Sequence, residues 1–127
     1  MRKLKIGLLP LYIKLYDDFN YVRHAGMEAY YEEIAAALET RGLEVCRVPV
    51  CRILPEFRAA VDSVEAADVD ALVTLNLAYS PSLESASVLA QTRLPLIVLD
   101  TTRDEVFDTE SDPGLLAFNH GIHGVQD

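Results

Sequence analysis

The sequence predicts an α/β protein: a three-layer Rossmann-like or flavodoxin-like sandwich on a parallel sheet, with strand order 2-1-3-4. Short apolar runs alternate with segments of helical periodicity, which is typical of strand–helix–strand units. The run over residues 71–78 is continuously apolar, as expected of a strand buried on both faces. The chain has 127 residues, half of them hydrophobic, so it has the length and composition of one domain with a core.

The first strand is expected over Lys5–Leu11, a compact apolar run. Its lone Gly7 indicates close packing, because the chain contains no glycine-rich phosphate-binding motif. A helix is predicted over residues 23–40, where apolar residues recur at helical spacing. Gly42 follows this segment, at the place where a helix-terminating glycine belongs.

A second strand is expected over residues 43–50, which are rich in β-forming side chains. Pro49 cannot donate to a ladder and therefore favours a position at the edge of the sheet. A helix should follow over about residues 55–67, with Pro55 in its first turn.

The predicted central strand is followed by Ser80 and Pro81, which we expect to be the N-cap and the first residue of the next helix. A fourth strand is predicted over residues 95–99, and an acidic loop over residues 102–117. The inner face of the helix after Pro81 is expected to consist of Leu83, Ala86, Leu89 and Ala90.

Charge and cysteine content narrow the classes of function. The formal net charge is −9 and no basic cluster with interleaved aromatics occurs, which argues against a nucleic-acid partner. No apolar run is long enough for a membrane span, and no signal peptide is expected. Cys46 and Cys51 lack metal-site spacing and are interpreted as free thiols, so we expect a cytoplasmic protein.

Ligands of open parallel sheets gather at the carboxyl ends of the strands. In this chain the rule nominates four segments: residues 9–12, 76–82, 100–102 and 119–123. Tyr12 and the nearby Tyr16 could stack on a sugar, or could form an aromatic pair over the sheet edge.

The last segment, residues 118–127, carries His120 and His123, each followed by a glycine. Helical structure is expected to begin near residue 119 or 120, and the segment resembles the opening of an element that continues further. Two histidines three residues apart share a helix face and could supply two metal ligands, but no His, Cys or Glu nearby completes a shell. A structural and a ligand-binding role for this pair both stay open.

Four segments occur in a characteristic order and spacing: residues 7–12, 71–82, 94–101 and 118–127. Together they resemble the N-terminal domain of the L-arabinose isomerase and L-fucose isomerase superfamily, over nearly the whole chain. The resemblance implies that residues 1–127 form a single α/β domain of a larger sugar isomerase, whose metal-binding domains lie elsewhere.

The same resemblance implies substrate-binding roles for particular side chains. Leu11 and Tyr12 match a Leu-Tyr pair at the end of the first strand of arabinose isomerases. Asn119 and His123 match the Asn-containing segment that ends in His-Gly. His120 falls where those enzymes have a glutamine and is included as a substrate-binding candidate. The resemblance implies no catalytic and no metal-ligating residue in this chain.

By resemblance, the full enzyme carries out metal-dependent aldose–ketose isomerisation, with a divalent cation, usually Mn²⁺, held by other domains. This chain would pack over the active site of a neighbouring subunit, contact the small-molecule sugar, and be inactive in isolation. Two alternatives stay open: a free-standing flavodoxin-like binding or interaction module without catalysis, and a scaffold whose strand ends hold no ligand.

Overall fold

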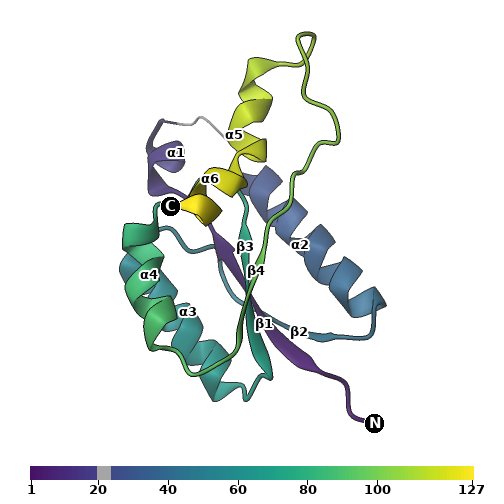
Figure 1. Cartoon of the computed structure of the whole chain (residues 1–127), viewed down its shortest axis with the longest axis vertical. Helices are drawn as coiled ribbons and strands as arrows, with labels where there is room; N and C mark the ends of the chain where they lie inside the picture. Colours follow the sequence, from purple (N-terminus) through teal and green to yellow (C-terminus); the bar gives the residue numbers. More distant parts are fainter. Residues whose placement is uncertain (20–23) are drawn as a thin grey trace.

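The computed structural model describes residues 1–19 and 24–127. It contains a four-stranded, all-parallel sheet in the order β2-β1-β3-β4, which confirms the predicted fold class and strand order (Figure 1). The strands are β1 (Lys5–Leu11), β2 (Glu44–Arg47), β3 (Ala71–Asn76) and β4 (Leu96–Leu99).

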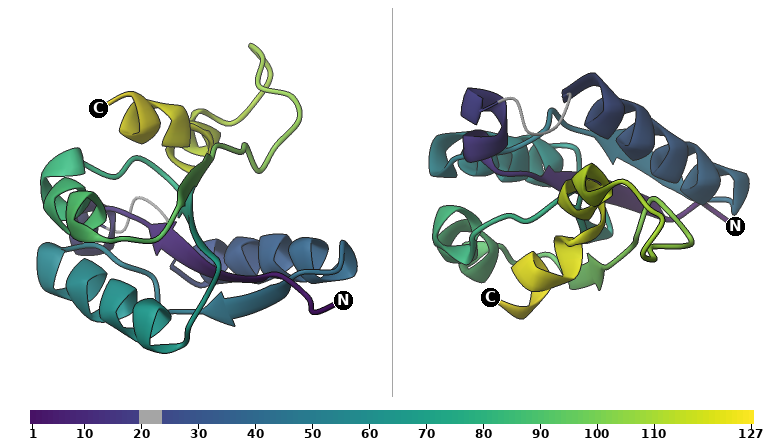
Figure 2. Two further views of the ribbon diagram at one scale, coloured as in Figure 1. Left: turned by 60° about the horizontal axis from the view of Figure 1, so that its bottom comes forward. Right: turned by 90° about the horizontal axis from the view of Figure 1, so that it is seen from above.

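Helices cover both faces of the sheet and complete the three layers (Figure 2). The long helix α2 (His24–Thr40) lies on one face, and α3 (Leu54–Ala66) and α4 (Ser82–Gln91) lie on the other. The carboxyl end of the sheet carries only short elements: α1 (Lys14–Phe19), a 3₁₀ turn (Pro113–Leu115), α5 (Leu116–Asn119) and α6 (Gly121–Gln126).

Each face of the sheet buries one apolar cluster. Leu8 and Met27 belong to the cluster beneath α2, and Phe57 and Val64 to the cluster beneath α3 and α4. Gly7 lets α3 approach the sheet closely, since a Cβ atom there would lie 2.3 Å from Val64 Cγ1. The close-packing interpretation of this glycine is therefore confirmed.

Helix α2 ends at Thr40, and Gly42 beyond it has φ +92°, the left-handed conformation expected of a glycine after a helix. Residue 23, where this helix was predicted to begin, lies outside the described residues. Helix α3 begins at Leu54 with Pro55 in its first turn, as predicted.

Two strands end earlier than predicted. β2 ends at Arg47 rather than at residue 50, and Pro49 lies beyond it. The chain returns to the sheet at Cys51, which forms an isolated bridge with Leu11. β3 ends at Asn76 rather than at residue 78, because the backbone then turns toward α4.

The predicted start of α4 is wrong. Pro81 is the N-cap, and the buried hydroxyl of Ser80 makes no hydrogen bond with any residue that the structure describes. The Ser82 N–H donates instead to Asp127 Oδ2, at 2.8 Å, so a carboxylate from the far end of the chain caps this helix. The predicted inner face is also wrong at Leu83, Ala86 and Ala90: α4 buries Ser85 and Val88, and Leu83 is 87% exposed.

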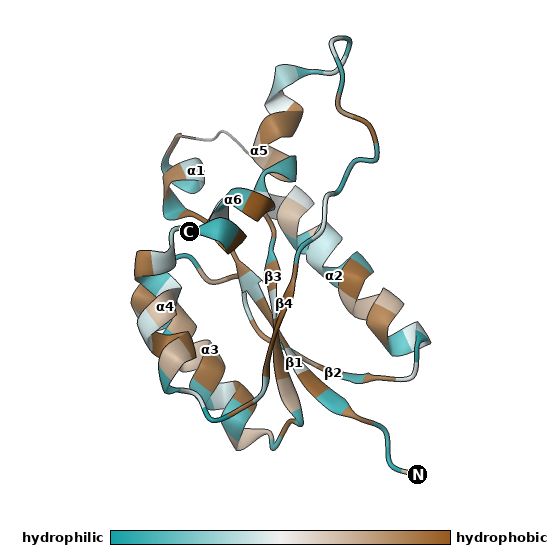
Figure 3. Cartoon of the chain, viewed as in Figure 1, coloured by the Kyte–Doolittle hydropathy of each residue, from teal (hydrophilic) through white to brown (hydrophobic). Residues whose placement is uncertain are grey.

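β4 departs from the pattern of a covered strand. Its ribbon has the brown of hydrophobic residues in Figure 3, yet Leu96, Ile97 and Val98 are 43%, 53% and 52% exposed. No helix in the described part of the chain is long and apolar enough to cross a bilayer.

Candidate functional site

The carboxyl end of the sheet brings together three of the four predicted segments. Leu11 and Asn76 end β1 and β3 and are partners in the parallel ladder. Helix α6 lies directly over the end of β3 (Figure 1). The fourth segment, residues 100–102, lies toward α2, where the Tyr30 hydroxyl donates to Thr101 Oγ1 at 2.6 Å.

An aromatic stack forms the centre of this region. The Tyr16 hydroxyl and His120 Nε2 share a hydrogen bond of 2.6 Å. The His120 ring stacks on Tyr16 with a centroid distance of 5.9 Å and on Tyr79 with a centroid distance of 6.1 Å. Three elements that are distant in sequence thus meet at one imidazole: α1, the β3–α4 connection and the α5–α6 junction.

A hollow of about 280 Å³ opens beside this stack. Ligand pockets typically measure roughly 300–1,000 Å³, so this hollow suits only a small molecule. Apolar surface dominates the lining, and Tyr16 and His120 supply its aromatic polar groups. We call it the Tyr16 hollow; it is lined by Tyr16, Pro113, Gly114, Leu116, Ala117 and His120.

Leu11 and Tyr12, the residues nominated at the end of the first strand, are both buried. Leu11 packs into the cluster beneath α3. Tyr12 is 0% exposed and meets Tyr16 edge-to-face, with centroids 6.1 Å apart. Burial raises the pKa of Tyr12 to about 12. Tyr12 therefore supports Tyr16 from beneath rather than lining the hollow.

Asn119 holds the loop that follows β4. Its amide nitrogen donates to Asp104 Oδ2 at 2.8 Å and to the Leu115 carbonyl at 2.9 Å. Its amide oxygen accepts the Asp104 N–H at 3.0 Å. These three bonds occupy most of the hydrogen-bonding capacity of the side chain, so Asn119 shapes the loop rather than facing the hollow.

His123 is exposed on α6 and lies next to His120, with ring centroids 5.7 Å apart. The pKa of His120 is lowered from its ordinary value of 6.5, first by burial and then by repulsion from His123. A neutral imidazole can both donate and accept a hydrogen bond.

The two glycines of α6 allow this helix to rest on the end of β3. A Cβ atom on Gly121 would lie 2.8 Å from the Asn76 carbonyl oxygen, and one on Gly124 would lie 2.6 Å from Asn76 Nδ2. These two glycines therefore allow α6 to pack closely against Asn76 and Ser80 of the same chain. Beneath α6, Asn76 Nδ2 and Ser80 Oγ are buried without a hydrogen-bond partner among residues 1–19 and 24–127.

Helix α1, which carries Tyr16, buries no residue completely and is attached through charge. Arg52 Nη1 donates to Asp17 Oδ2 at 2.8 Å, and Arg52 Nη2 donates to Glu56 Oε1 at 2.7 Å. The Arg52 guanidinium lowers the pKa of Glu56. This bridge links α1 to the first turn of α3 and thereby fixes one wall of the Tyr16 hollow.

The residues described do not fit the Mn²⁺ site that the resemblance implies for the full enzyme. Within residues 1–19 and 24–127, no three His, Cys, Asp or Glu side chains come close enough to hold a metal ion. Manganese prefers several hard oxygen ligands, whereas the centre of this region consists of imidazole and phenol groups.

Sequence reasoning missed Tyr79 as a member of the stack. Its only signal was an aromatic residue inside a nominated segment, one position before Ser80. No protein-family model matches the chain, and no curated protein sequence is significantly similar to it.

Proposed function

We propose that the carboxyl end of this sheet contacts a small sugar, and that the chain is the N-terminal domain of a metal-dependent aldose–ketose isomerase of the arabinose and fucose isomerase type. In this role it packs over the active site of a neighbouring subunit, whose metal-bearing domains perform the isomerisation. The observation that carries the proposal is the Tyr16–His120 pair, hydrogen-bonded at 2.6 Å on the wall of a small hollow at the strand ends.

The chemistry of this wall suits a polyol. Aromatic faces pack against the apolar face of a sugar ring, and neutral side chains exchange hydrogen bonds with its hydroxyl groups. The lowered pKa keeps His120 neutral near pH 7. With Nε2 bonded to Tyr16, Nδ1 is the ring nitrogen that no hydrogen bond among the described residues uses.

The nominated residues would then act in different ways. His120 and the exposed His123 would contact the sugar directly. Leu11 and Tyr12, being buried, would position the wall, and Asn119 would hold the loop beside it. We also propose that the protein is cytoplasmic, which its two free cysteines support.

A kinetic experiment tests the isomerase proposal. The longest protein that the gene encodes and the 127-residue chain are both assayed with Mn²⁺, pentoses and 6-deoxyhexoses. The longer protein should convert aldose to ketose, whereas the chain alone should not. His123→Asn should raise KM more than it lowers kcat, and the exposed Leu83→Ala should change neither. An inactive longer protein, or an active isolated chain, would contradict the proposal.

A free-standing binding module is the rival, favoured by the hydrogen-bonded Tyr16–His120 pair on the wall of the Tyr16 hollow, which could contact a ligand directly. Calorimetry separates the two. Saturable heat with a sugar and the isolated chain, abolished by His120→Ala, would favour the module. A domain that needs a metal-bearing partner should give no measurable heat.

A further inference from the structure

The first turn of α4 binds a carboxylate that belongs to another element. This ten-residue helix begins at Ser82, whose N–H donates to Oδ2 of Asp127, the residue after α6, at 2.8 Å. Figure 1 shows the end of α6 beside this turn. The bond lowers the pKa of Asp127. The amino end of a helix attracts negative charge, because its first N–H groups have no partner within the helix and its dipole is positive there.

Two further donors next to this turn are buried without a partner. Asn76 Nδ2 and Ser80 Oγ make no hydrogen bond with the part of the chain that the structure describes, and the two residues are 4% and 1% exposed. A buried donor without an acceptor destabilises a folded protein, so such groups are rare. Two of them side by side indicate a place where an acceptor can bind.

Helix α6 lies directly on these donors. A Cβ atom on Gly124 would lie 2.6 Å from Asn76 Nδ2 and 2.9 Å from the backbone N of Ser80. The Asn76 amide and Ser80 therefore face the same point of α6, three residues before Asp127. Together with the Ser82 N–H they form one group of donors, which an acceptor could reach if α6 moved away.

Helix α6 is held by few contacts. It has six residues, of which only Gly121 is buried. Gly121 and Gly124 are both weak helix formers. Segments with few buried apolar contacts open more readily than the core of a protein. A ligand that competes with the Asp127 carboxylate could therefore displace α6 without unfolding the sheet.

We propose that the amino end of α4, with Asn76 and Ser80, is a binding site for a small oxyanion, and that Asp127 takes the place of this ligand while α6 is closed. The group of donors consists of a backbone N–H, an amide NH₂ and a hydroxyl. Carboxylate and phosphate groups suit such a set, because they offer several lone pairs. The inference goes beyond the proposed function and does not depend on it.

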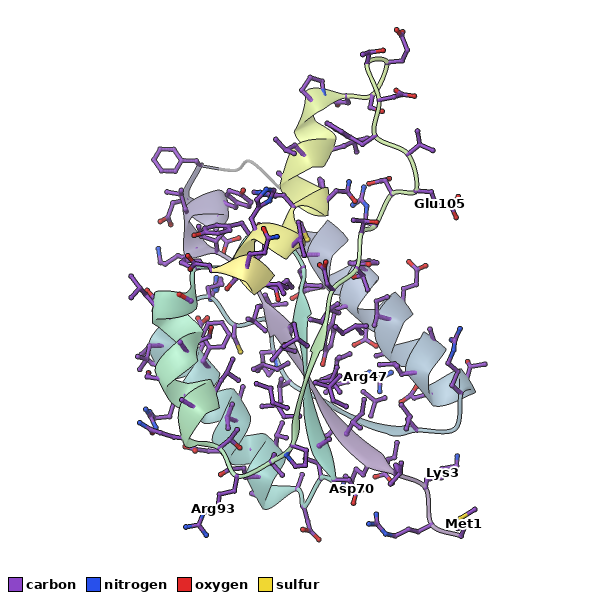
Figure 4. The ribbon with its side chains drawn as sticks, viewed as in Figure 1. Met1, Lys3, Arg47, Asp70, Arg93 and Glu105 are labelled. Atoms are coloured by element: carbon purple, nitrogen blue, oxygen red, sulfur yellow. The ribbon has the colours of Figure 1, made fainter. Side chains whose placement is uncertain are left out.

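Binding at this site should be weak. Figure 4 shows Lys3 and Arg93 projecting from the opposite, amino end of the sheet. Glu84, the acid in the first turn of α4, accepts the Leu54 N–H at 2.7 Å and is thus engaged with α3. The attraction for an anion therefore comes from the helix end and from neutral donors.

The first test is a titration of the 127-residue chain with inorganic phosphate, at an ionic strength held constant with chloride. The NMR signals of the Ser82 N–H and the Asn76 amide report binding. Asp127→Asn removes the competing carboxylate and should strengthen phosphate binding at least about fivefold, because α6 is then open more often. Asp112→Asn is the matched control: Asp112 also accepts a backbone N–H, that of Gly114 at 2.8 Å, but lies far from α4 in sequence and caps the 3₁₀ turn.

Asp112→Asn removes the same charge and should leave the affinity for phosphate unchanged. The proposal would be overturned if phosphate shifted neither reporter signal in Asp127→Asn, or if chloride alone produced the same shifts. Equal affinities of Asp127→Asn and Asp112→Asn would also contradict it.

The second test removes one of the buried donors. In the Asp127→Asn background, Ser80→Ala should weaken phosphate binding about tenfold, because a hydrogen bond to a charged group is lost. The same change should not lower the urea midpoint of unfolding, since it leaves no group newly unpaired. A variant that is less stable yet binds phosphate as before would give Ser80 a structural role only and contradict the proposal.

A parallel titration with acetate identifies the kind of oxyanion. Tighter binding of phosphate would assign the site to a phosphate group, and tighter binding of acetate to a carboxylate. Neither titration contains a sugar, so the result is independent of the outcome of the isomerase assay. Binding of neither anion would contradict the proposal.

Discussion

Tyr16 and His120 are hydrogen-bonded at 2.6 Å although 104 positions separate them in the chain. The bond joins α1 to the junction of α5 and α6, two parts of the molecule that bury few side chains. The wall of the Tyr16 hollow therefore depends on this hydrogen bond and the ring stacking around it, together with the Arg52 bridge that holds α1. Changes at this pair should affect the site while leaving the sheet intact.

Tyr16→Phe keeps the ring but removes the hydroxyl. Loss of one hydrogen bond to a partly buried imidazole should lower the free energy of unfolding by about 1 kcal/mol. Urea denaturation followed by circular dichroism measures this change. Tyr79→Phe is the control, because the Tyr79 hydroxyl makes no hydrogen bond with the described residues and only its ring stacks on His120. Equal effects of the two variants would show that the hydrogen bond from the Tyr16 hydroxyl to His120 contributes no measurable stability.

Stability should fall as the pH drops below the ordinary histidine pKa. Burial lowers the pKa of His120 in the folded state, so the unfolded chain binds more protons from about pH 6.5 downward. This contribution is fully present above the unfolded pKa and is lost as the pH falls through the folded pKa. Unfolding midpoints in urea at about pH 7.5 and about pH 5.5 measure it. His120→Gln should reduce the difference, and His123→Gln should leave most of it; an unchanged difference in His120→Gln would assign it to other groups.

Gly124→Ala should destabilise the protein, although alanine normally favours a helix. The added Cβ would lie 2.6 Å from Asn76 Nδ2 and 2.9 Å from the backbone N and O of Ser80. Lifting α6 away from this contact should cost roughly 1–3 kcal/mol. Gly26→Ala in α2 is the matched control, because its Cβ would lie 3.6 Å from the nearest atom, Phe118 Cε1. That variant should be about 0.5–1 kcal/mol more stable than wild type. Thermal unfolding distinguishes the opposite signs.

Gly7→Ala should be rescued in part by shortening its neighbour. The new Cβ would clash with Val64 Cγ1 at 2.3 Å, and the strain should cost roughly 1–3 kcal/mol. Val64→Ala alone should cost about 2 kcal/mol, because Val64 is fully buried. The double variant should lose less than the sum of the two, by about 1 kcal/mol or more. Strict additivity in a chemical-denaturation cycle would mean that this contact does not set the distance between α3 and the sheet.

The periodic parts of the fold could be predicted from sequence. Helix α2 and Gly42 follow directly from helical spacing and an end glycine, and the strand order follows from the βαβ pattern. Helix α1 could not be predicted, because residues 14–19 bury no side chain completely and are attached through Arg52, far along the chain. The inner face of α4 was mistaken at Leu83 because that residue lies in the first turn, where it is almost fully exposed.

The region of the candidate site could be predicted from sequence, but the side chains that line it could not. The rule that ligands gather at strand ends correctly grouped Tyr12, Asn76 and His120. It could not tell which side chains line a hollow, because Tyr12 turned inward, while Tyr16 and Tyr79 flank His120. A continuous apolar run likewise predicts that a strand belongs in a sheet without saying what covers it, as β4 demonstrates.

Cys51 lies where the chain pairs with the end of β1 again, after β2. Its N–H donates to the Pro10 carbonyl, its thiol lies 3.2 Å from the Pro49 carbonyl oxygen, and burial raises its pKa to about 12. Thiol reagents react with the thiolate, so Cys51 should not be alkylated while its segment is paired with β1. Cys46, which is half-buried, should react sooner. The alkylation rate of Cys51 relative to that of Cys46 would thus measure how often the segment around Cys51 detaches from β1.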